Sequence, residues 1–358
     1  MLSFVVRRLF MAIPVLLGIL FVTFSLARLL PGDPCRAALG ERATDKVCEE
    51  FIRRKGLDQP IPVQFYQYLG EVLQGNLGES FDLGRPATTI LVERLPVTVE
   101  LAVCALLVAV VIGIPLGVIS AYRANSAVDI VTMVGANIGV SMPVFWLGLM
   151  LAYIFAVLLK GTPFWLPPSG RLTAGMPLPS LIEVWNLQHL NGLPLGIAKF
   201  FSNMNIFNAL VTGNFPALWD AIRHMILPAI ALGTIPGAII ARMTRSSLLE
   251  VLGLDYIRTA RAKGLREFRV VLRHGMANAM LPVVTVIGLS LGELLGGAVL
   301  TETIFGLSGV GLTLFESITA RDYTIVQAFT LVIAFSFVII NLIVDVSYAY
   351  LDPRIRLS

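Results

Sequence analysis

The stretch DYIRTARAKGLREFRVVLRH, residues 255–274, decides how the rest of the sequence is interpreted. Residues 242–273 hold eight Lys or Arg and three Asp or Glu, a net charge of +5, and long apolar runs flank them on both sides. Such runs are stable in lipid, and a cationic segment tethered between two membrane spans stays on the cytoplasmic face. The segment is therefore expected to be presented to soluble partners in the cytoplasm.

The composition defines the class of protein. The chain has 358 residues, of which 56% are hydrophobic and 14% charged, and its mean hydropathy is +0.81. A soluble domain carries about 25% charged residues, so this sequence is expected to fold as an all-α polytopic membrane protein. The formal net charge of +4 is small and confined to a few segments. It follows membrane topology and gives no indication of a nucleic-acid partner.

Six apolar runs are long enough to cross a bilayer, which needs about 20 apolar residues per helix. The first run is long and has no small-residue cleavage site after it, so it is expected to remain as a span. The third run contains Met142 and Pro143, which predict either one kinked helix, the interpretation we favour, or two short helices. The six predicted spans are residues 9–30, 97–122, 130–159, 225–241, 281–303 and 325–350.

Charge bias orients these spans. Short cytoplasmic loops are enriched in Lys and Arg, and the basic residues Arg7, Arg8, Arg123, Arg354 and Arg356 all fall on one side of a six-span arrangement. The N-terminus, residues 123–129, the loop at 246–280 and the C-terminus are therefore expected in the cytoplasm. The chain then divides into an N-terminal transmembrane helix (1–30), an outer loop with short helices (31–95), and a membrane core (96–358) with an outer insertion at 160–223.

The first outer loop carries a turn signal and two cysteines. Residues 31–34 read Pro-Gly-Asp-Pro and are expected to stop the first helix. An amphipathic stretch follows at 44–55, with Val47, Phe51 and Ile52 on one side. Cys35 and Cys48 are either two unrelated thiols or a disulfide, the second being possible because this loop should face an oxidising compartment.

The basic segment has an apolar stripe at helical spacing. It consists of Ile257, Ala260, Gly264, Phe268 and Val271, with most of the arginines on other faces. One interpretation is an interfacial helix that lies on anionic lipid. The other is a docking element, because its small residues allow close backbone approach and Gly264 can end a short helix in a left-handed conformation.

The residues 258–264, RTARAKG, resemble the EAA loop of ABC-importer permeases, whose short helix inserts into a groove on a cytoplasmic ATPase subunit. Ala260 and Gly264 fall on the motif's Ala and Gly, whereas Thr259 stands at its first acidic position. Leu281-Pro282 also comes later than in sugar permeases. The resemblance implies that the ATPase-coupling residues are Asp255, Arg258, Thr259, Ala260, Arg261, Ala262, Lys263, Gly264 and Leu265.

The resemblance extends over nearly the whole chain. The motifs LLPGDP (29–34), SMPVFWLG (141–148), RMTRSS (242–247), LTETIF (300–305) and DPRIR (352–356) look like the dipeptide/oligopeptide permease family, most of all its B-type subunits. This implies the six-helix type I importer fold in a bacterial inner membrane, without a cofactor of its own. The implied partners are a second homologous permease, membrane lipid, two cytoplasmic subunits that bind ATP and Mg, and a periplasmic substrate-binding protein.

The cargo implied by the resemblance is dipeptides or short peptides. Related permeases carry haem, nickel or glutathione, and these stay open as alternatives. Glu293 is expected in the middle of the fifth span, where a charge is costly unless it faces water or a partner, so it either lines a pathway or forms a structural hydrogen bond. Glu100 is expected to sit near the outer interface. The pathway candidates are Met142, Phe145, Trp146, Glu293 and Asn341.

Other function classes find little support in the sequence. Residues 306–309, Gly-Leu-Ser-Gly, could suggest an intramembrane serine protease, but no histidine lies in the body of a span to act as base. The chain has no Gly-x-x-x-x-Gly-Lys-Ser/Thr phosphate loop and no cluster with metal-ligand spacing. A stand-alone secondary transporter would need inverted repeats, which are not seen. We therefore predict no catalytic residue, no metal site and no enzymatic activity of its own.

Overall fold

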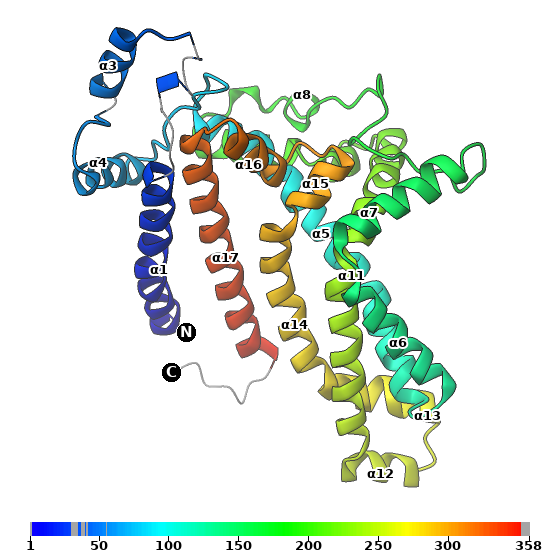
Figure 1. Cartoon of the computed structure of the whole chain (residues 1–358). Helices are drawn as coiled ribbons and strands as arrows, with labels where there is room; N and C mark the ends of the chain where they lie inside the picture. The colour runs from blue at the N-terminus through cyan, green and yellow to red at the C-terminus, as the bar shows by residue number, and fades with distance from the viewer. Residues whose placement is uncertain (1, 30–34, 37–39, 41, 55, 352–358) are drawn as a thin grey trace.

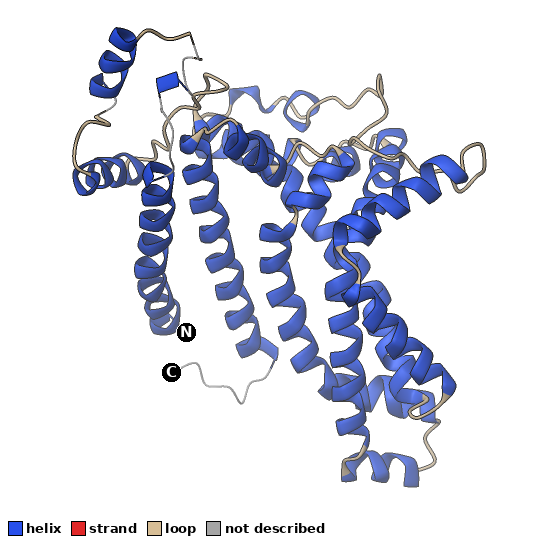
Figure 2. Ribbon diagram, viewed as in Figure 1, coloured by secondary structure: helices blue, strands red, loops and turns tan. Residues whose placement is uncertain are grey.

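The computed structural model describes residues 2–29, 35–36, 40, 42–54 and 56–351, and these residues form an all-α protein (Figure 2). No strand occurs in this part of the chain, apart from an isolated bridge between Glu79 and Pro86. The predicted turn at 31–34 and the motif at 352–356 lie outside the described residues. The long helices are α1 (Leu2–Leu29), α5 (Ala87–Tyr122), α11 (Phe215–Leu252), α14 (Met276–Gly297) and α17 (Tyr323–Leu351).

Shorter helices cap the two ends of the bundle of long helices (Figure 1). We call these two ends outer and inner after the predicted orientation. At the outer end lie α3 (Asp45–Arg54), α4 (Ile61–Leu73) and α8 (Leu181–Val184), together with α9 (Leu193–Ser202), α10 (Asn205–Val211), α15 (Val299–Phe305) and α16 (Val310–Thr319). At the opposite end lie α12 (Asp255–Ala262) and α13 (Glu267–Arg269). The start of α1 and the end of α17 also point toward that opposite end.

Five helices in the described residues are long and apolar enough to cross a membrane, and two bent helix pairs bring the possible number to seven. Five of the six predicted spans correspond to long helices. The count of six stays a prediction, because it depends on which bent pair crosses the membrane. The predicted span at 281–303 is divided between α14 and α15, which separate at Ala298.

The third predicted span is two helices, so the preference for a single kinked helix is wrong. The first is α6 (Ala127–Ser141), and the second is α7 (Val144–Ala152), which continues into the π-helix η1 (Tyr153–Leu158). Their axes differ by 102°. Met142 is extended, with φ −77° and ψ 128°, because the ring of Pro143 disfavours helical backbone in the residue before it. The helix therefore ends instead of bending.

Helices α5 and α11 pack through a seam of small residues. Along α5 the seam consists of Ala105, Ala109, Gly113 and Gly117, and along α11 of Gly233, Gly237 and Ala241. A Cβ atom built on Gly233 would lie 2.5 Å from the carbonyl oxygen of Ala105, and one on Gly117 would lie 2.5 Å from that of Ala241. Only glycine allows such an approach, as is usual where membrane helices pack without a hydrophobic driving force.

The outer end is held by Glu100, a carboxylate that lies at the expected end of α5 but whose burial the sequence did not indicate. Glu100 is 3% exposed and is not a residue at the interface with solvent. It forms an ion pair of 2.9 Å with Arg171 of the outer insertion and accepts hydrogen bonds from the backbone N–H groups of Asn205 and Ile206. The charge is stabilised by these donors, so the insertion is pinned onto the top of α5.

A second buried carboxylate organises the bent pair α15–α16. Glu302 is fully buried and accepts a 2.6 Å hydrogen bond from the Thr98 hydroxyl of α5, while the backbone N–H of Leu312 donates to its other oxygen at 2.9 Å. A Cβ atom on Gly309 would collide with this carboxylate at 2.5 Å. Glu302 therefore satisfies N–H groups in the first turn of α16 and joins the pair to α5.

The first outer loop is closed by a disulfide between Cys35 and Cys48, the second of the two alternatives that the sequence left open. The bridge is buried under Phe51, whose ring makes an edge contact with Phe81 at 5.9 Å. Phe51 lies on α3, so the amphipathic stretch at 44–55 forms the expected helix as far as Arg54, and Lys55 lies outside the described residues.

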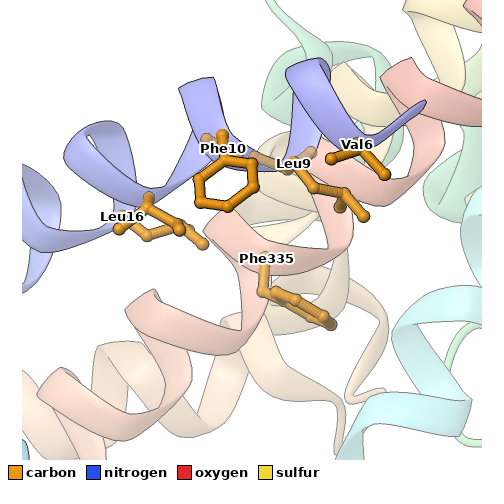
Figure 3. Close-up of a pocket in the computed structure, with 8 residues that line it drawn as sticks. Val6, Leu9, Phe10, Leu16 and Phe335 are labelled. Carbon is orange, nitrogen blue, oxygen red and sulfur yellow. The ribbon is translucent and has the colours of Figure 1, made fainter. Parts of the chain in front are cut away.

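Helix α1 packs loosely against α17. At its inner end, Arg8 forms a 3.0 Å ion pair with Asp345 of α17. Between the two helices lies an apolar cavity of about 340 Å³, lined by Val6, Leu9, Phe10, Leu16 and Phe335 among others (Figure 3). Few side chains of α1 are buried within this chain, and its main partners are α17 and α4.

Candidate functional site

The candidate site is the segment from Leu254 to Gly275 at the inner end of the bundle. It begins where α11 ends at Leu252 and Leu254 turns extended, with φ −77° and ψ 152°. Helix α12 runs from Asp255 to Ala262 and stops at Gly264, whose φ of +72° is in the left-handed region. The Gly264 N–H donates to the Arg261 carbonyl at 2.9 Å. The predicted left-handed end of the helix is confirmed, and this conformation favours glycine at 264.

The apolar stripe predicted for residues 257–271 is only partly continuous. Ile257 is fully buried and Ala260 is 8% exposed, and both pack against Val270, with Leu252 and Leu265 at the edge. Gly264 and Phe268 are exposed instead. The reason is that the turn at Gly264 reverses the chain, so 255–274 is α12, a turn, α13 and the π-helix η3 (Val270–Gly275), not one helix.

Ala260 is therefore not a small residue left open for a partner, as the sequence suggested. It is used to dock α12 onto the chain's own α13–η3 segment. The opposite face of α12 is exposed and polar. Its exposed residues are Asp255, Arg258, Thr259, Arg261, Ala262 and Lys263, followed by Gly264, while Leu265 is half-buried.

Two ion pairs order this exposed face. Two nitrogens of Arg261 donate to the carboxylate of Glu267, with a shortest distance of 2.7 Å, and Arg258 contacts Asp255 at 3.3 Å. The Arg261 pair closes the turn at Gly264 from the outside. Because it is exposed, it contributes little stability and fixes the shape of the turn instead. Hydrogen bonding to Glu267 raises the pKa of Arg261 above its ordinary value.

Apolar side chains lie exposed beside this basic face. Phe268 is 71% exposed, Leu254 47% and Leu272 42%. Exposed apolar groups next to a polar rim are typical of protein–protein contact sites. The segment thus combines a rigid turn, several uncompensated basic charges and exposed apolar side chains.

The segment is tied to the helical bundle by a buried ion pair near the inner end of α11. Arg245 donates two hydrogen bonds of 2.7 Å to Asp129 at the start of α6, and Asp129 is 3% exposed. The Ser120 hydroxyl of α5 also donates to Asp129, as does the Asn125 backbone N–H at 2.9 Å. This pair joins α5, α6 and α11 just before α11 enters the exposed segment. RMTRSS contains Arg245, but nothing in the sequence showed its partner.

The pathway candidates are not brought together by the structure. Phe145 and Trp146 are 46% and 45% exposed on α7, which packs on α11 and α15, and Met142 is half-buried at the break before it. Glu293 is exposed near the end of α14, not in the middle of a span as expected.

Asn341 lies on α17, which packs on α14 and α1. It is between Phe337 and Val344, which pack onto Gly292 and Gly288 of α14. Its Oδ1 is buried without a hydrogen-bond partner in the described part of the chain. Within one chain these five residues therefore form no common site, and their assignment to a pathway stays a prediction. The described residues also contain no cluster of three or more His, Cys, Asp or Glu side chains that could hold a metal ion.

Comparison with known families now defines the class of this protein. A model of binding-protein-dependent transport system inner membrane components matches residues 113–357, and a model of the N-terminal part of such membrane components matches residues 1–102. The chain therefore belongs to this family of inner-membrane transport components, and it is a multi-pass membrane protein.

Individual relatives match along the whole chain. It is 44% identical over 356 residues to the dipeptide transport system permease protein DppB of Alkalihalophilus pseudofirmus, covering 99% of this chain and 100% of that protein. It is 43% identical to the protein of the same name from Escherichia coli, covering 99% of each chain. The glutathione transport system permease protein GsiC of Pectobacterium atrosepticum is 38% identical, again over 99% of each chain.

The Asp129–Arg245 pair is predicted to hold the inner end of the bundle together. Asp129→Ala leaves the Arg245 guanidinium without its carboxylate and should lower the free energy of unfolding by about 3 kcal/mol. This is the lower end of the range for a broken buried ion pair, because Arg245 is partly exposed. Thermal unfolding of the purified protein measures the loss. Asp255→Ala, which breaks the exposed pair with Arg258, is the matched control and should leave the unfolding temperature nearly unchanged. Equal effects of the two substitutions would contradict the role given to Asp129.

Proposed function

We propose that this chain is the membrane-spanning permease subunit of an ATP-driven importer of dipeptides. The observation that carries the proposal is the 43–44% identity, over essentially the full length of both chains, to permeases named for dipeptide transport. A permease named for glutathione transport is less similar, at 38%. Glutathione is itself a short peptide, so this relative supports peptide cargo as a class and favours neither haem nor nickel.

In this proposal the energy comes from partner subunits. Two cytoplasmic ATPase subunits bind ATP and Mg, a second homologous permease completes the pathway, and a periplasmic substrate-binding protein delivers the peptide. The chain itself hydrolyses nothing. Its part is mechanical: it receives motion at α12 and changes the packing of its long helices, which is the general basis of alternating access.

The exposed face of α12 is the surface proposed to meet an ATPase subunit. Arg258, Lys263 and the backbone around Gly264 are accessible there, and Phe268 and Leu254 supply apolar contact area beside them. Ala260 contributes from the inside, by fixing α12 on Val270. Force applied to α12 therefore passes through Ile257 and Ala260 to η3 and α14, and through Leu252 to α11.

The proposed orientation places α12 and both termini in the cytoplasm and the loops 31–95 and 160–223 outside. Two observations support it: the charge bias of the short loops, and the disulfide in the first outer loop, since disulfides form in oxidising compartments. The arrangement in Figure 1 is compatible with it, because α12 lies at the end opposite to α3 and α4.

Labelling with a membrane-impermeant thiol reagent tests this orientation. In a Cys104→Ala background, Leu73→Cys at an 80% exposed position should react from outside intact cells, whereas Phe268→Cys, at a 71% exposed position, should react only after the cytoplasmic face is opened. Cys35 and Cys48 should react only after reduction. Labelling of Phe268→Cys in intact cells would overturn the orientation.

Uptake measurements test the cargo. A strain that lacks this chain should lose uptake of labelled dialanine, and a plasmid copy should restore it, while uptake of free alanine through other carriers stays constant. Excess unlabelled dipeptide should compete with the labelled dialanine more strongly than glutathione does. Competition by glutathione alone would assign the transporter to glutathione instead.

The turn at Gly264 is predicted to be essential for coupling. No atom lies within 4 Å of a Cβ built on Gly264, so the chain itself has space for a side chain, but φ is +72°. Gly264→Val would strain this conformation by about 1–2 kcal/mol, whereas Gly264→Asn tolerates it. Both variants should reach the membrane at wild-type levels.

Gly264→Val should lose ATPase co-purification and dialanine uptake. Such a loss could come from strain in the left-handed turn or from a side chain that blocks the partner. If the Gly264→Asn variant keeps uptake, the left-handed turn is what matters. If it loses uptake, a partner approaches the bare backbone. Wild-type uptake in the valine variant would remove the turn from the coupling mechanism.

A further inference from the structure

A polar cavity lies at the outer end of α1, away from the candidate site. It has a volume of about 190 Å³ and lies between the end of α1, helix α4, the stretch 78–81 and the start of α17. Side chains that line it include Arg28, Gln64, Tyr68, Glu71, Glu79 and Gln327. Ligand pockets for drug-sized molecules are about 300–1,000 Å³, so this cavity suits a smaller molecule or the end of one.

Among the described residues that line this cavity, Arg28 is the one with a positive charge, and its guanidinium is held in place without a carboxylate. Its Nε donates a 2.6 Å hydrogen bond to Gln64 Oε1, and its plane lies 3.4 Å from the centre of the Phe24 ring. No Asp or Glu of the described residues forms an ion pair with it. A guanidinium stays charged at neutral pH.

Gln64 has a fixed role in this arrangement. Its amide nitrogen donates to the carbonyl oxygens of Leu57 at 3.1 Å and Gln59 at 2.7 Å, which leaves its oxygen to accept from Arg28. The bond to Gln64 fixes the orientation of the guanidinium. Among the described residues, one further N–H group makes a weak 3.4 Å contact, to the Phe24 carbonyl. Arg28 is half-buried, and a charge removed from water in this way is costly unless an anion or water completes its unused donors.

Two further polar groups in the cavity have unused capacity. The Tyr68 hydroxyl is buried and has no hydrogen-bond partner among the described residues, and burial raises its pKa to about 12, so it remains protonated. Gln327 of α17 is 4% exposed. In contrast, Glu71 and Glu79 are exposed at the rim. The cavity is thus lined by a half-buried cation, by neutral donors and acceptors, and by two exposed carboxylates.

We propose that this cavity binds an α-amino-acid zwitterion, as a free amino acid or as a short peptide, with its carboxylate on Arg28 and its ammonium group toward Glu71 and Glu79. A guanidinium matches a carboxylate with paired hydrogen bonds. The rim carboxylates repel phosphate and other multivalent anions and attract an ammonium group. With a dipeptide bound, Tyr68 and Gln327 can pair with the amide group between the two charges; a free amino acid has no polar atom there. This site is separate from the pathway candidates and does not depend on the cargo proposed above.

Equilibrium binding to the assembled transporter in lipid nanodiscs, without substrate-binding protein, tests the site. The probes are labelled alanine and labelled dialanine, which separate a free amino acid from a peptide. N-acetylalanine lacks the ammonium group and alanine amide lacks the carboxylate, so neither should compete. Arg28→Gln should weaken binding about tenfold or more, as expected for loss of hydrogen bonds to a charged group. Glu71→Gln with Glu79→Gln and, separately, Tyr68→Phe should weaken it several-fold.

Controls separate loss of the site from loss of the fold. Arg53→Gln removes an exposed arginine of the same outer loop and should leave binding unchanged. Every variant is checked for assembly and for an intact Cys35–Cys48 bridge. Binding of the probe in a translocation pathway would persist in the Arg28→Gln variant. Only the part of the bound probe that is lost in this variant is therefore assigned to the cavity.

Three results would overturn the proposal: no saturable binding of either probe to wild type, equal binding to well-assembled Arg28→Gln, or competition by N-acetylalanine or phosphate as strong as by alanine.

Discussion

The close approach of α5 and α11 is the constraint on which the rest of the structure depends. The two backbones come so near that a Cβ built on Gly113, Gly117, Gly233 or Gly237 would meet a carbonyl oxygen or a Cα atom of the other helix. In a membrane such contact replaces the hydrophobic driving force that packs soluble helices, because lipid tails are as apolar as the side chains. The seam makes α5 and α11 one rigid pair around which the other helices are arranged.

Buried polar contacts sit at both ends of this rigid pair. At the outer end, Glu100 holds the insertion through Arg171, and Thr98 holds the α15–α16 bend through Glu302. At the inner end, Ser120 and Arg245 converge on Asp129. Each carboxylate has several donors, and a buried charge requires this. Each of these polar contacts needs a particular donor and acceptor, whereas apolar helix faces can pack against many surfaces. The polar contacts therefore determine where each loop docks.

The inner end also explains how a small segment can act on a large bundle. Helix α12 is fixed to the chain by Ile257 and Ala260, which pack on Val270 and the end of α11. Directly behind it, η3 is a π-helix that runs into α14, and a Cβ on its Gly275 would lie 2.9 Å from Leu248 of α11. π-helical turns are frequently found at functional sites. Displacement of α12 is therefore transmitted to two membrane helices at once.

The sequence by itself determined the all-α membrane class, five of the long helices, the left-handed glycine at 264 and the candidate segment 255–274, because hydropathy, charge bias and glycine conformation are properties of short stretches. It also allowed the Cys35–Cys48 bridge. Only the tertiary structure decided the partners of Glu100, Asp129 and Glu302, the sharp break at Met142-Pro143, and that Ala260 faces inward. Such features depend on contacts between residues that are far apart in the sequence, 204 positions for Thr98 and Glu302. No local sequence pattern encodes which polar groups meet. The cavity around Arg28 belongs with them, since its walls come from four separate parts of the chain.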